Sequence, residues 1–332
     1  MASIAKGECV DPHESRVSLE QWVPQWELTL HHLRPRTKQL NVGVADNYLI
    51  PRFGDRPLDS ITRSDVQAML REELAAGELS NSAVRRHVMV LSQILQSAVE
   101  DGRLGRNVAK GIRLPPEQAR SMRRLNEVEL QRLISATPTF YQPMVMTAAF
   151  LGLRWGEITG LGLEHLNFDE ATIRVERQMQ DIGGKMQFTQ PKSKAGYRTV
   201  SAPETLMDVL RAHVKRRQVR ESALVFPGED GRPLRNGTFR RVWLRVVEQA
   251  DLDGFVFHEL RHTAAALAIA QGAHPMAIKE RLGHASITTT LDRYGGLFPS
   301  LDRDIANGLD GSVRRASKVL DATATPDLEL GL

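Results

Sequence analysis

The sequence predicts a mainly α protein with a small β-sheet, organised as an all-helical domain followed by a mixed α/β domain. The 332 residues are enough for about two or three domains. Hydrophobic residues make up 41% of the chain but aromatic residues only 5%, which favours helices packed through Leu, Val and Ala. Apolar residues at helical spacing fill the first third, whereas strand-like segments occur only between residues 172 and 200.

Residues 15–110 are predicted to form the all-helical domain, preceded by a short arm at residues 1–14. Ser18 fits a capping box at the start of the first helix, and Thr62 begins the third. The four expected helices cover about residues 17–33, 36–50, 63–76 and 81–100. Four helices in so short a stretch are typical of one small helical domain.

A basic, proline-broken segment at residues 111–124 is predicted to link this domain to a second one at residues 125–308. Asn126 can cap the first helix of the second domain, and helices are expected again towards residue 308. Residues 309–332 are expected to form a C-terminal tail that is acidic at its end. The segments of regular structure expected after Asn126 are an apolar helix at about Pro143–Leu151 and strands at Thr172–Arg177, Met186–Gln190 and Tyr197–Val200.

Basic residues are clustered, although the net charge is only +4 and the pI about 9.3. Residues 103–124 hold seven Arg or Lys against one acidic residue, and residues 211–220 hold five against none. Clusters of this kind attract polyanions, while a solvated helix face is the plainer interpretation of any single one. One cysteine, Cys9, and no apolar run of about 18 residues indicate a soluble, cytoplasmic protein without a membrane partner.

Three motifs of the second domain suit the chemistry of a phosphodiester. They are Leu-Gly-Leu-Arg154, His258-x-x-Arg261, and Leu-Gly-His284 followed ten residues later by Tyr294. Arginines can neutralise non-bridging phosphate oxygens with paired N–H donors, and histidines can donate hydrogen bonds or move protons. A tyrosine can attack phosphorus and remain bound as a covalent intermediate.

In this order the motifs resemble those of the tyrosine site-specific recombinases of the phage-integrase type. The resemblance covers about residues 15–300. It implies a SAM-like core-binding domain and a catalytic domain that close on duplex DNA. It also implies that Arg154 and Arg261 clamp the scissile phosphate and that His258 and His284 support it. Tyr294 would then form a 3′-phosphotyrosyl intermediate without a metal, ATP or another cofactor.

The same family uses a lysine on a β-hairpin turn to protonate the leaving 5′ oxygen. Lys194, which precedes an Ala-Gly turn, matches that lysine best, with Lys192 as the runner-up and Lys185 as a more distant candidate. Glu157 lies three residues after Arg154 and is expected to orient its guanidinium, although a purely structural ion pair explains this spacing equally well.

The resemblance implies double-stranded DNA with attachment sites as the partner, bound by a homotetramer on paired sites. A directionality protein stays open as an additional partner. Phosphate contacts are expected to dominate the affinity and to weaken steeply with salt. The candidate DNA-contacting residues are basic or imidazole side chains on expected helices, in the linker or near a helix start: Arg34, Arg36, Lys38, Arg85, Arg86, His87, Arg123, Arg124, Arg235, Arg240 and Arg241.

A metal site is the main alternative for one of these motifs. His258-Glu-Leu-Arg-His262 has the spacing of the zinc-protease helix, and Glu280 lies downstream where a third ligand might fall. Arg261 inside the motif argues against it, because a fixed positive charge would stand beside a dication. We therefore expect no metal here.

Three other functions remain to be weighed against an integrase of a phage or mobile element. A Xer-like resolvase shares the reaction, and a type IB topoisomerase shares the nicking and closing but acts alone. A DNA-binding protein with a decayed catalytic set is the third. The complete set of Arg, Lys, His and Tyr argues against the last, and the compact helical first domain argues against the topoisomerase.

Overall fold

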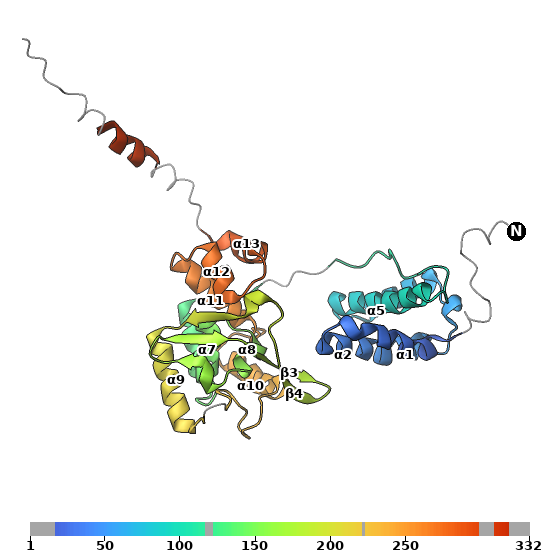
Figure 1. Cartoon of the computed structure of the whole chain (residues 1–332), viewed down its shortest axis with the longest axis horizontal. Coiled ribbons are helices and arrows are strands. Elements are labelled where there is room, and N and C mark those ends of the chain that lie inside the picture. The colour runs from blue at the N-terminus through green and yellow to red at the C-terminus, as the bar shows by residue number, and fades with distance from the viewer. Residues whose placement is uncertain (1–16, 117–121, 221–222, 299–308, 319–332) are drawn as a thin grey trace, which may run out of the picture. The chain divides into compact units, whose positions relative to one another are not determined.

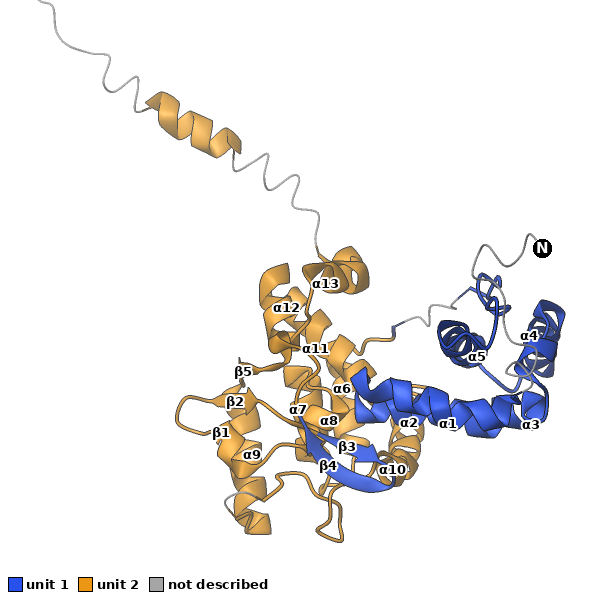
Figure 2. Ribbon diagram, turned by 45° about the vertical axis from the view of Figure 1, so that its right-hand side comes forward, with its two compact units in different colours: residues 1–122, 179–189 blue, residues 123–178, 190–332 orange. Residues whose placement is uncertain are grey.

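The computed structural model describes residues 17–116, 122–220, 223–298 and 309–318. The chain divides into two compact units, of which one comprises Met1–Met122 and Met179–Thr189 and the other Arg123–Gln178 and Gln190–Leu332 (Figures 1 and 2). The expected arm at residues 1–14 and the last part of the expected tail, residues 319–332, lie outside the described residues.

The first unit contains the helices predicted for the N-terminal third. Ser18 caps the first of them and Thr62 the fourth α-helix, each through a capping box, and Gly77 ends that helix with a left-handed conformation. The apolar stripes of these helices meet in one core that includes Trp26, which is 1% exposed. The α-helices are α1 (Leu19–Thr29), α2 (Pro35–Val44), α3 (Ile50–Phe53), α4 (Arg63–Ala76) and α5 (Asn81–Glu100).

The second expected helix does not run evenly to Ile50. A π-helical turn at Ala45–Leu49 joins α2 to α3, so helical backbone continues as far as Phe53. Pro51 has no N–H to donate, and its ring would crowd the carbonyl of Asn47 in a regular α-helix. A wider turn before the proline relieves that crowding.

The second unit is built around α7 (Gln142–Leu151), a helix buried on most of its faces. Gly152 follows it with φ +66°, and a Cβ there would lie only 2.5 Å from a methyl of Leu282. The end of α7 therefore packs directly against Leu282. The other α-helices of the unit are α6 (Glu127–Ala136), α8 (Trp155–Thr159), α9 (Glu204–Arg217), α10 (Asn236–Gln249), α11 (Glu259–Ala270), α12 (Pro275–Leu282) and α13 (Ile287–Tyr294).

The β-structure forms two small antiparallel sheets. The strands β1 (Leu166–Asn167), β2 (Thr172–Val175) and β5 (Arg198–Ser201) form one sheet in the order β1-β2-β5, with Ile173 opposite Val200. The strands β3 (Gln178–Ile182) and β4 (Lys185–Thr189) form a hairpin that turns at Gly183 and Gly184. The sequence did not predict β3, because its residues Gln-Met-Gln-Asp-Ile carry little β-branched character.

The last described segment of the chain is helical, and none of the described helices is suited to crossing a membrane. Residues 309–318 are helical, although the sequence assigned them to the tail, and Asp310 pairs with Arg314 one turn on. Among the residues that the structure describes, no helix combines the length and apolar character needed to cross a membrane.

Candidate active site

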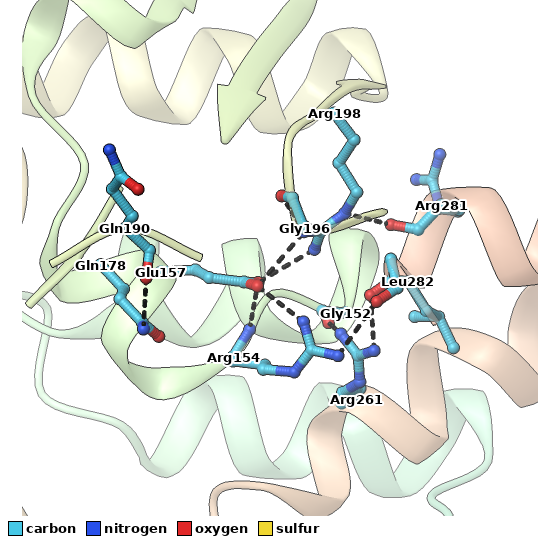
Figure 3. Close-up of polar contacts among 11 residues, drawn as sticks. Gly152, Arg154, Glu157, Gln178, Gln190, Gly196, Arg198, Arg261, Arg281 and Leu282 are labelled. Atoms are coloured by element: carbon cyan, nitrogen blue, oxygen red, sulfur yellow. Dashed lines mark hydrogen bonds and ion pairs between the residues drawn. The ribbon is translucent and has the colours of Figure 1, made fainter. Parts of the chain in front are cut away.

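Helix α11 carries Arg261, the most deeply buried cation of the site. The side chain of Arg261 is 2% exposed and donates through Nη1 to the carbonyl of Gly152 at 2.6 Å and through Nη2 to that of Leu282 at 2.5 Å (Figure 3). Burial and then the charge of Arg154 lower the pKa of Arg261 to about 9, so it stays charged at neutral pH. The two carbonyls accept hydrogen bonds from the guanidinium group of Arg261 without neutralising its positive charge.

Arg154, which directly precedes α8, binds the carbonyl next to the one that Arg261 binds at Leu282. Its Nη2 donates to the carbonyl of Gly283 at 3.2 Å, and Gly283 directly follows Leu282, whose carbonyl Arg261 contacts. Because the two arginines bind consecutive carbonyls, their guanidinium groups converge on one point. The side chain of Arg154 is 38% exposed, which leaves it accessible to a ligand.

Glu157 pairs with Arg154, a contact that fits both interpretations of the sequence. Its carboxylate accepts from Arg154 Nη1 at 2.7 Å and from the backbone N–H of Arg154 at 2.9 Å. Burial acts to raise the pKa of Glu157, but hydrogen bonds and charge from Arg198 and then Arg154 outweigh it and keep the pKa below its usual range. The carboxylate is therefore ionised at neutral pH.

Arg198 is a site residue that the sequence analysis did not identify. Its two Nη atoms lie 3.2 and 2.9 Å from the carboxylate oxygens of Glu157, and its Nε donates to the carbonyl of Arg281 at 2.8 Å (Figure 3). A further bond joins Nη1 to the carbonyl of Gly196 at 3.1 Å. The strand alternation places Arg198 on the same side as the buried Val200, and this signal could have revealed it.

The lysine candidates lie in different places. Lys194 begins a 3₁₀ turn, Lys194–Gly196, that leads into β5, with its side chain exposed. The expectation that Lys194 lies on a β-hairpin turn is wrong, because the hairpin turn is Gly183–Gly184 and Lys185 starts the strand after it. The carbonyl of Ala195 is so close to Gly283 that a Cβ there would lie 2.6 Å from it. The turn of Lys194 therefore adjoins the carbonyl that Arg154 contacts.

Tyr294 ends α13 and is 1% exposed. Its hydroxyl lies 2.8 Å from Nδ1 of His262, which belongs to α11 and was considered in the sequence only as a metal ligand. The ring of His284 is stacked near Tyr294 with 6.4 Å between centroids and 10° between planes. His284 Nδ1 bonds the hydroxyl of Thr290 at 2.8 Å, and its buried Nε2 has no partner among the described residues.

These buried groups are uncharged at neutral pH. Burial first, and then the charges of Arg261 and Arg154, lower the pKa of His284 to about 3. Burial also raises the pKa of Tyr294, against the opposing charges of nearby arginines. The site thus combines fixed positive charge with a neutral phenol and a neutral imidazole.

His258 lies at the solvent side of the site. It precedes α11, its side chain is exposed, and its ring is 5.6 Å from that of His262 at an interplanar angle of 85°. Desolvation by neighbouring atoms, and then the charges of Arg261 and Arg154, lower the pKa of His258. In the part of the chain that the structure describes, no group of three or more His, Cys, Asp or Glu side chains has the arrangement of a metal site.

The chain matches two family models. Residues 123–299 match the phage integrase family, and residues 18–74 match the N-terminal SAM-like domain of phage integrases. The chain belongs to the phage integrase family. It is a site-specific tyrosine recombinase, an enzyme that transfers DNA strands.

Relatives and solved structures agree with this assignment. The integrase is 31% identical over 294 residues to the ICEBs1 integrase of Bacillus subtilis, which covers 83% of this chain and 78% of that protein. It is 28% identical over 297 residues to the prophage phiRv2 integrase of Mycobacterium tuberculosis, covering 86% of this chain and 75% of that protein.

The fold is that of solved integrases. The Tn1549 transposon integrase in complex with a circular intermediate DNA matches with a TM-score of 0.71 at 18% identity, covering 90% of this chain and 99% of that one. A lambda integrase dimer bound to a COC′ core site matches with a TM-score of 0.64 at 20% identity, covering 82% and 97%.

The candidate DNA contacts differ widely in exposure. His87 is not one of them: it is 3% exposed, its Nδ1 lies 3.0 Å from Glu73, and its ring packs on Tyr48, so it cannot reach a phosphate. The remaining candidates stay predictions. Exposed among them are Arg34, Arg36, Arg124, Arg235, Arg240 and Arg241, and partly buried are Lys38, Arg85, Arg86 and Arg123.

Replacing Arg198 tests whether it positions Arg154. In Arg198→Met, Glu157 keeps one of its two cationic partners, and we expect covalent strand cleavage to slow by about 10–100-fold because a misplaced clamp loses much of its effect. The measurement is the single-turnover rate of protein–DNA adduct formation. Arg174→Met removes an exposed arginine of β2 and should leave that rate unchanged. Equal rates in both variants would contradict the positioning role.

Replacing Gly283 tests the contact between the lysine turn and the arginine site. Gly283→Ala and Gly272→Ala both place a side chain at positive φ, +65° and +78°, but only the former meets an atom within 4 Å. The positive φ alone should cost both variants about 1–2 kcal/mol of stability in thermal unfolding, and Gly283→Ala should lose more because its Cβ meets the carbonyl of Ala195. Only Gly283→Ala should also slow adduct formation, by more than about tenfold, because the turn of Lys194 must move. Similar adduct rates in the two variants would refute this.

Proposed function

We propose that this integrase cleaves and rejoins DNA at paired attachment sites through a 3′-phosphotyrosyl intermediate on Tyr294, and so integrates or excises a phage or mobile element. The observation that carries the proposal is the convergence of Arg154 and Arg261 on consecutive carbonyls within the unit that holds Tyr294 and His284. Fixed positive charge next to a phenol suits a phosphodiester, whose displacement depends on positioning and charge stabilisation.

In the proposed cleavage step, Oη of Tyr294 bonds to phosphorus and the bond from phosphorus to the 5′ oxygen breaks. Arg154 and Arg261 hold the non-bridging oxygens, since each Nη has a second N–H beyond the one bound to a carbonyl or to the carboxylate of Glu157. The leaving 5′ oxygen takes a proton from Lys194. His258 and His284 support the phosphate through hydrogen bonds. A 5′ hydroxyl of a partner strand then attacks the phosphotyrosine, and one ester replaces another without ATP.

The proposed substrate and assembly are double-stranded DNA and a homotetramer on two paired sites. The lambda integrase tetramer bound to a Holliday junction, which matches this chain with a TM-score of 0.65, supports this assembly. Exposed basic residues such as Arg240 and Arg241 on α10 supply charge for phosphates. Such an enzyme works on the nucleoid in the cytoplasm. The directionality protein stays a prediction.

The nucleophile is tested with a duplex nicked close to the crossover point, made from the DNA that flanks the protein's own gene. The short fragment beyond the break diffuses away, so the adduct accumulates and is counted on a denaturing gel. We expect an adduct with the wild-type protein and none with Tyr294→Phe. Tyr197→Phe, which changes an exposed tyrosine at the end of the lysine turn, should retain it. An adduct in Tyr294→Phe would place the nucleophile elsewhere.

The leaving-group acid is tested by replacing the bridging 5′ oxygen with sulfur, because a thiolate leaves without a proton. We expect Lys194→Ala to slow cleavage of the ordinary duplex by about 10²–10³-fold and to approach the wild-type rate on the sulfur duplex. Lys192→Ala and Lys185→Ala serve as matched variants and should cleave both duplexes at rates close to wild type. Sulfur rescue of Lys192→Ala instead would reassign the acid.

A further inference from the structure

The hydrogen bond between His262 and Tyr294 joins two buried side chains from α11 and α13. His262 is 5% exposed and Tyr294 is 1% exposed, and 2.8 Å separates Nδ1 from the hydroxyl oxygen. Ala265, Ile269, Ile278 and Leu282 form the apolar cluster around the phenol. The burial of Tyr294 shields its hydroxyl from solvent, and His262 is a protein group in direct contact with that hydroxyl.

His262 is the histidine placed to receive that proton. His284 uses Nδ1 for Thr290, and its ring stacks parallel to the phenol rather than pointing at the hydroxyl. His258 is exposed and contacts the edge of the His262 ring. Among the described residues, the hydrogen-bond partner of Oη of Tyr294 is Nδ1 of His262.

Burial, and then the groups around His262, keep its imidazole neutral before DNA binds. Desolvation first, then His258, Arg293, Arg261 and Arg124, lower the pKa of His262 to about 4. Arg124 is held beside α11 because the next residue, Leu125, donates its N–H to the hydroxyl of Thr263 at 3.1 Å. A neutral imidazole has one free lone pair, and the contact at Nδ1 places that lone pair towards the phenol when the ring proton is on Nε2.

We propose that His262 is a catalytic residue that accepts the proton of Tyr294 as the phenol attacks phosphorus. This inference rests on the proposed function of Tyr294. The bond from Oη to phosphorus forms while the O–H bond breaks, and the electron pair of that O–H bond remains on Oη. The proton moves to Nδ1 of His262, giving an imidazolium. In the rejoining step the imidazolium returns the proton to the departing phenolate.

The scissile phosphate makes this transfer more favourable than it is in the free protein. Its negative charge opposes the charges of Arg293, Arg261 and Arg124, which help to lower the basicity of His262, and bond formation at Oη makes the phenol more acidic. Acceptor and attacking atom are already in contact, so the transfer requires no diffusing water.

The test uses His262→Asn on the nicked duplex with sulfur at the 5′ bridging position. Asn keeps an oxygen close to the position of Nδ1 and so preserves a hydrogen bond, but it cannot take a proton. The sulfur leaving group removes the demand for an acid, so the pH profile reports the nucleophile. His274→Asn is the matched control, since His274 is exposed and caps α12 through Nδ1, a role that Asn fills well.

We expect the wild-type and His274→Asn rates to be nearly flat between about pH 6 and 9, because an internal base supplies the phenolate. His262→Asn should be about 10²-fold slower at neutral pH and should accelerate close to tenfold for each pH unit, as the fraction of phenolate rises towards the pKa of tyrosine, about 10. A wild-type rate in His262→Asn overturns the proposal. So does a slow rate with a flat profile, which leaves His262 a positioning residue.

A second measurement covers the case in which His262→Asn does not fold. The nitrogen chemical shifts of ¹⁵N-histidine-labelled wild-type protein report the tautomer of each ring. The signals of His262 and His284, whose rings both lie beside Tyr294, are identified as those that shift in Tyr294→Phe, and the signal missing from His284→Asn belongs to His284. We expect the Nε2–H tautomer for His262, and an Nδ1–H tautomer overturns the proposal. Failure of the proposed function is distinct, because it appears as an adduct formed by Tyr294→Phe itself.

Discussion

The site depends on the compensation of one buried carboxylate. Glu157 is 2% exposed, and an isolated charge at such a position costs several kcal/mol. Arg154 and Arg198 both bind it, and each of them also binds a carbonyl at or just after the end of α12. Three segments far apart in the sequence are thereby tied together by a single charge. Two cations to one anion leave a net positive charge, which is what a phosphodiester requires.

Arg261 adds positive charge in a different way. It is buried, yet the structure gives its Nη atoms backbone carbonyls as partners, at Gly152 and Leu282. Carbonyl dipoles fix the direction of the guanidinium without cancelling its charge, whereas a carboxylate would cancel it. The left-handed Gly152 makes one of these carbonyls available, because it allows α7 to end against Leu282. In this unit, the packing of the backbone therefore also determines the electrostatics of the site.

The features that could be predicted from the sequence are those decided by neighbouring residues. The capping box predicted at Ser18 and the helix cap predicted at Asn126 are local features, and both are confirmed. The two pairings that were missed join residues far apart: Arg198 is 41 positions from Glu157, and His262 is 32 positions from Tyr294. Local spacing carries no information on such pairs, although the alternation along β5 marked Arg198 as inward-facing.

The error at His87 has a different origin. Its neighbours Arg85 and Arg86 suggested a basic surface, but His87 follows the apolar stripe of α5, three residues after Val84 and four before Leu91. Applying the helical period to each residue of that segment separately would have placed its ring inside. The charge of a segment thus does not show which of its side chains are exposed. Burial has to be assigned to each residue separately, and only exposed side chains can contact DNA.

In the proposed reaction, the two oxygens exchanged at phosphorus differ in acidity, and the groups proposed to serve them lie in different surroundings. The phenol of Tyr294 is the stronger acid, so it leaves readily when a 5′ hydroxyl attacks but must first lose a proton to become a good nucleophile. It lies inside the protein next to a neutral imidazole. The 5′ oxygen is the poorer leaving group and needs a proton donor, and the exposed Lys194 lies on the turn beside Gly283. In the proposed mechanism, a buried base for one oxygen and an accessible acid for the other would let the same site run the ester exchange in both directions, since each group ends a cleavage step in the protonation state that rejoining requires.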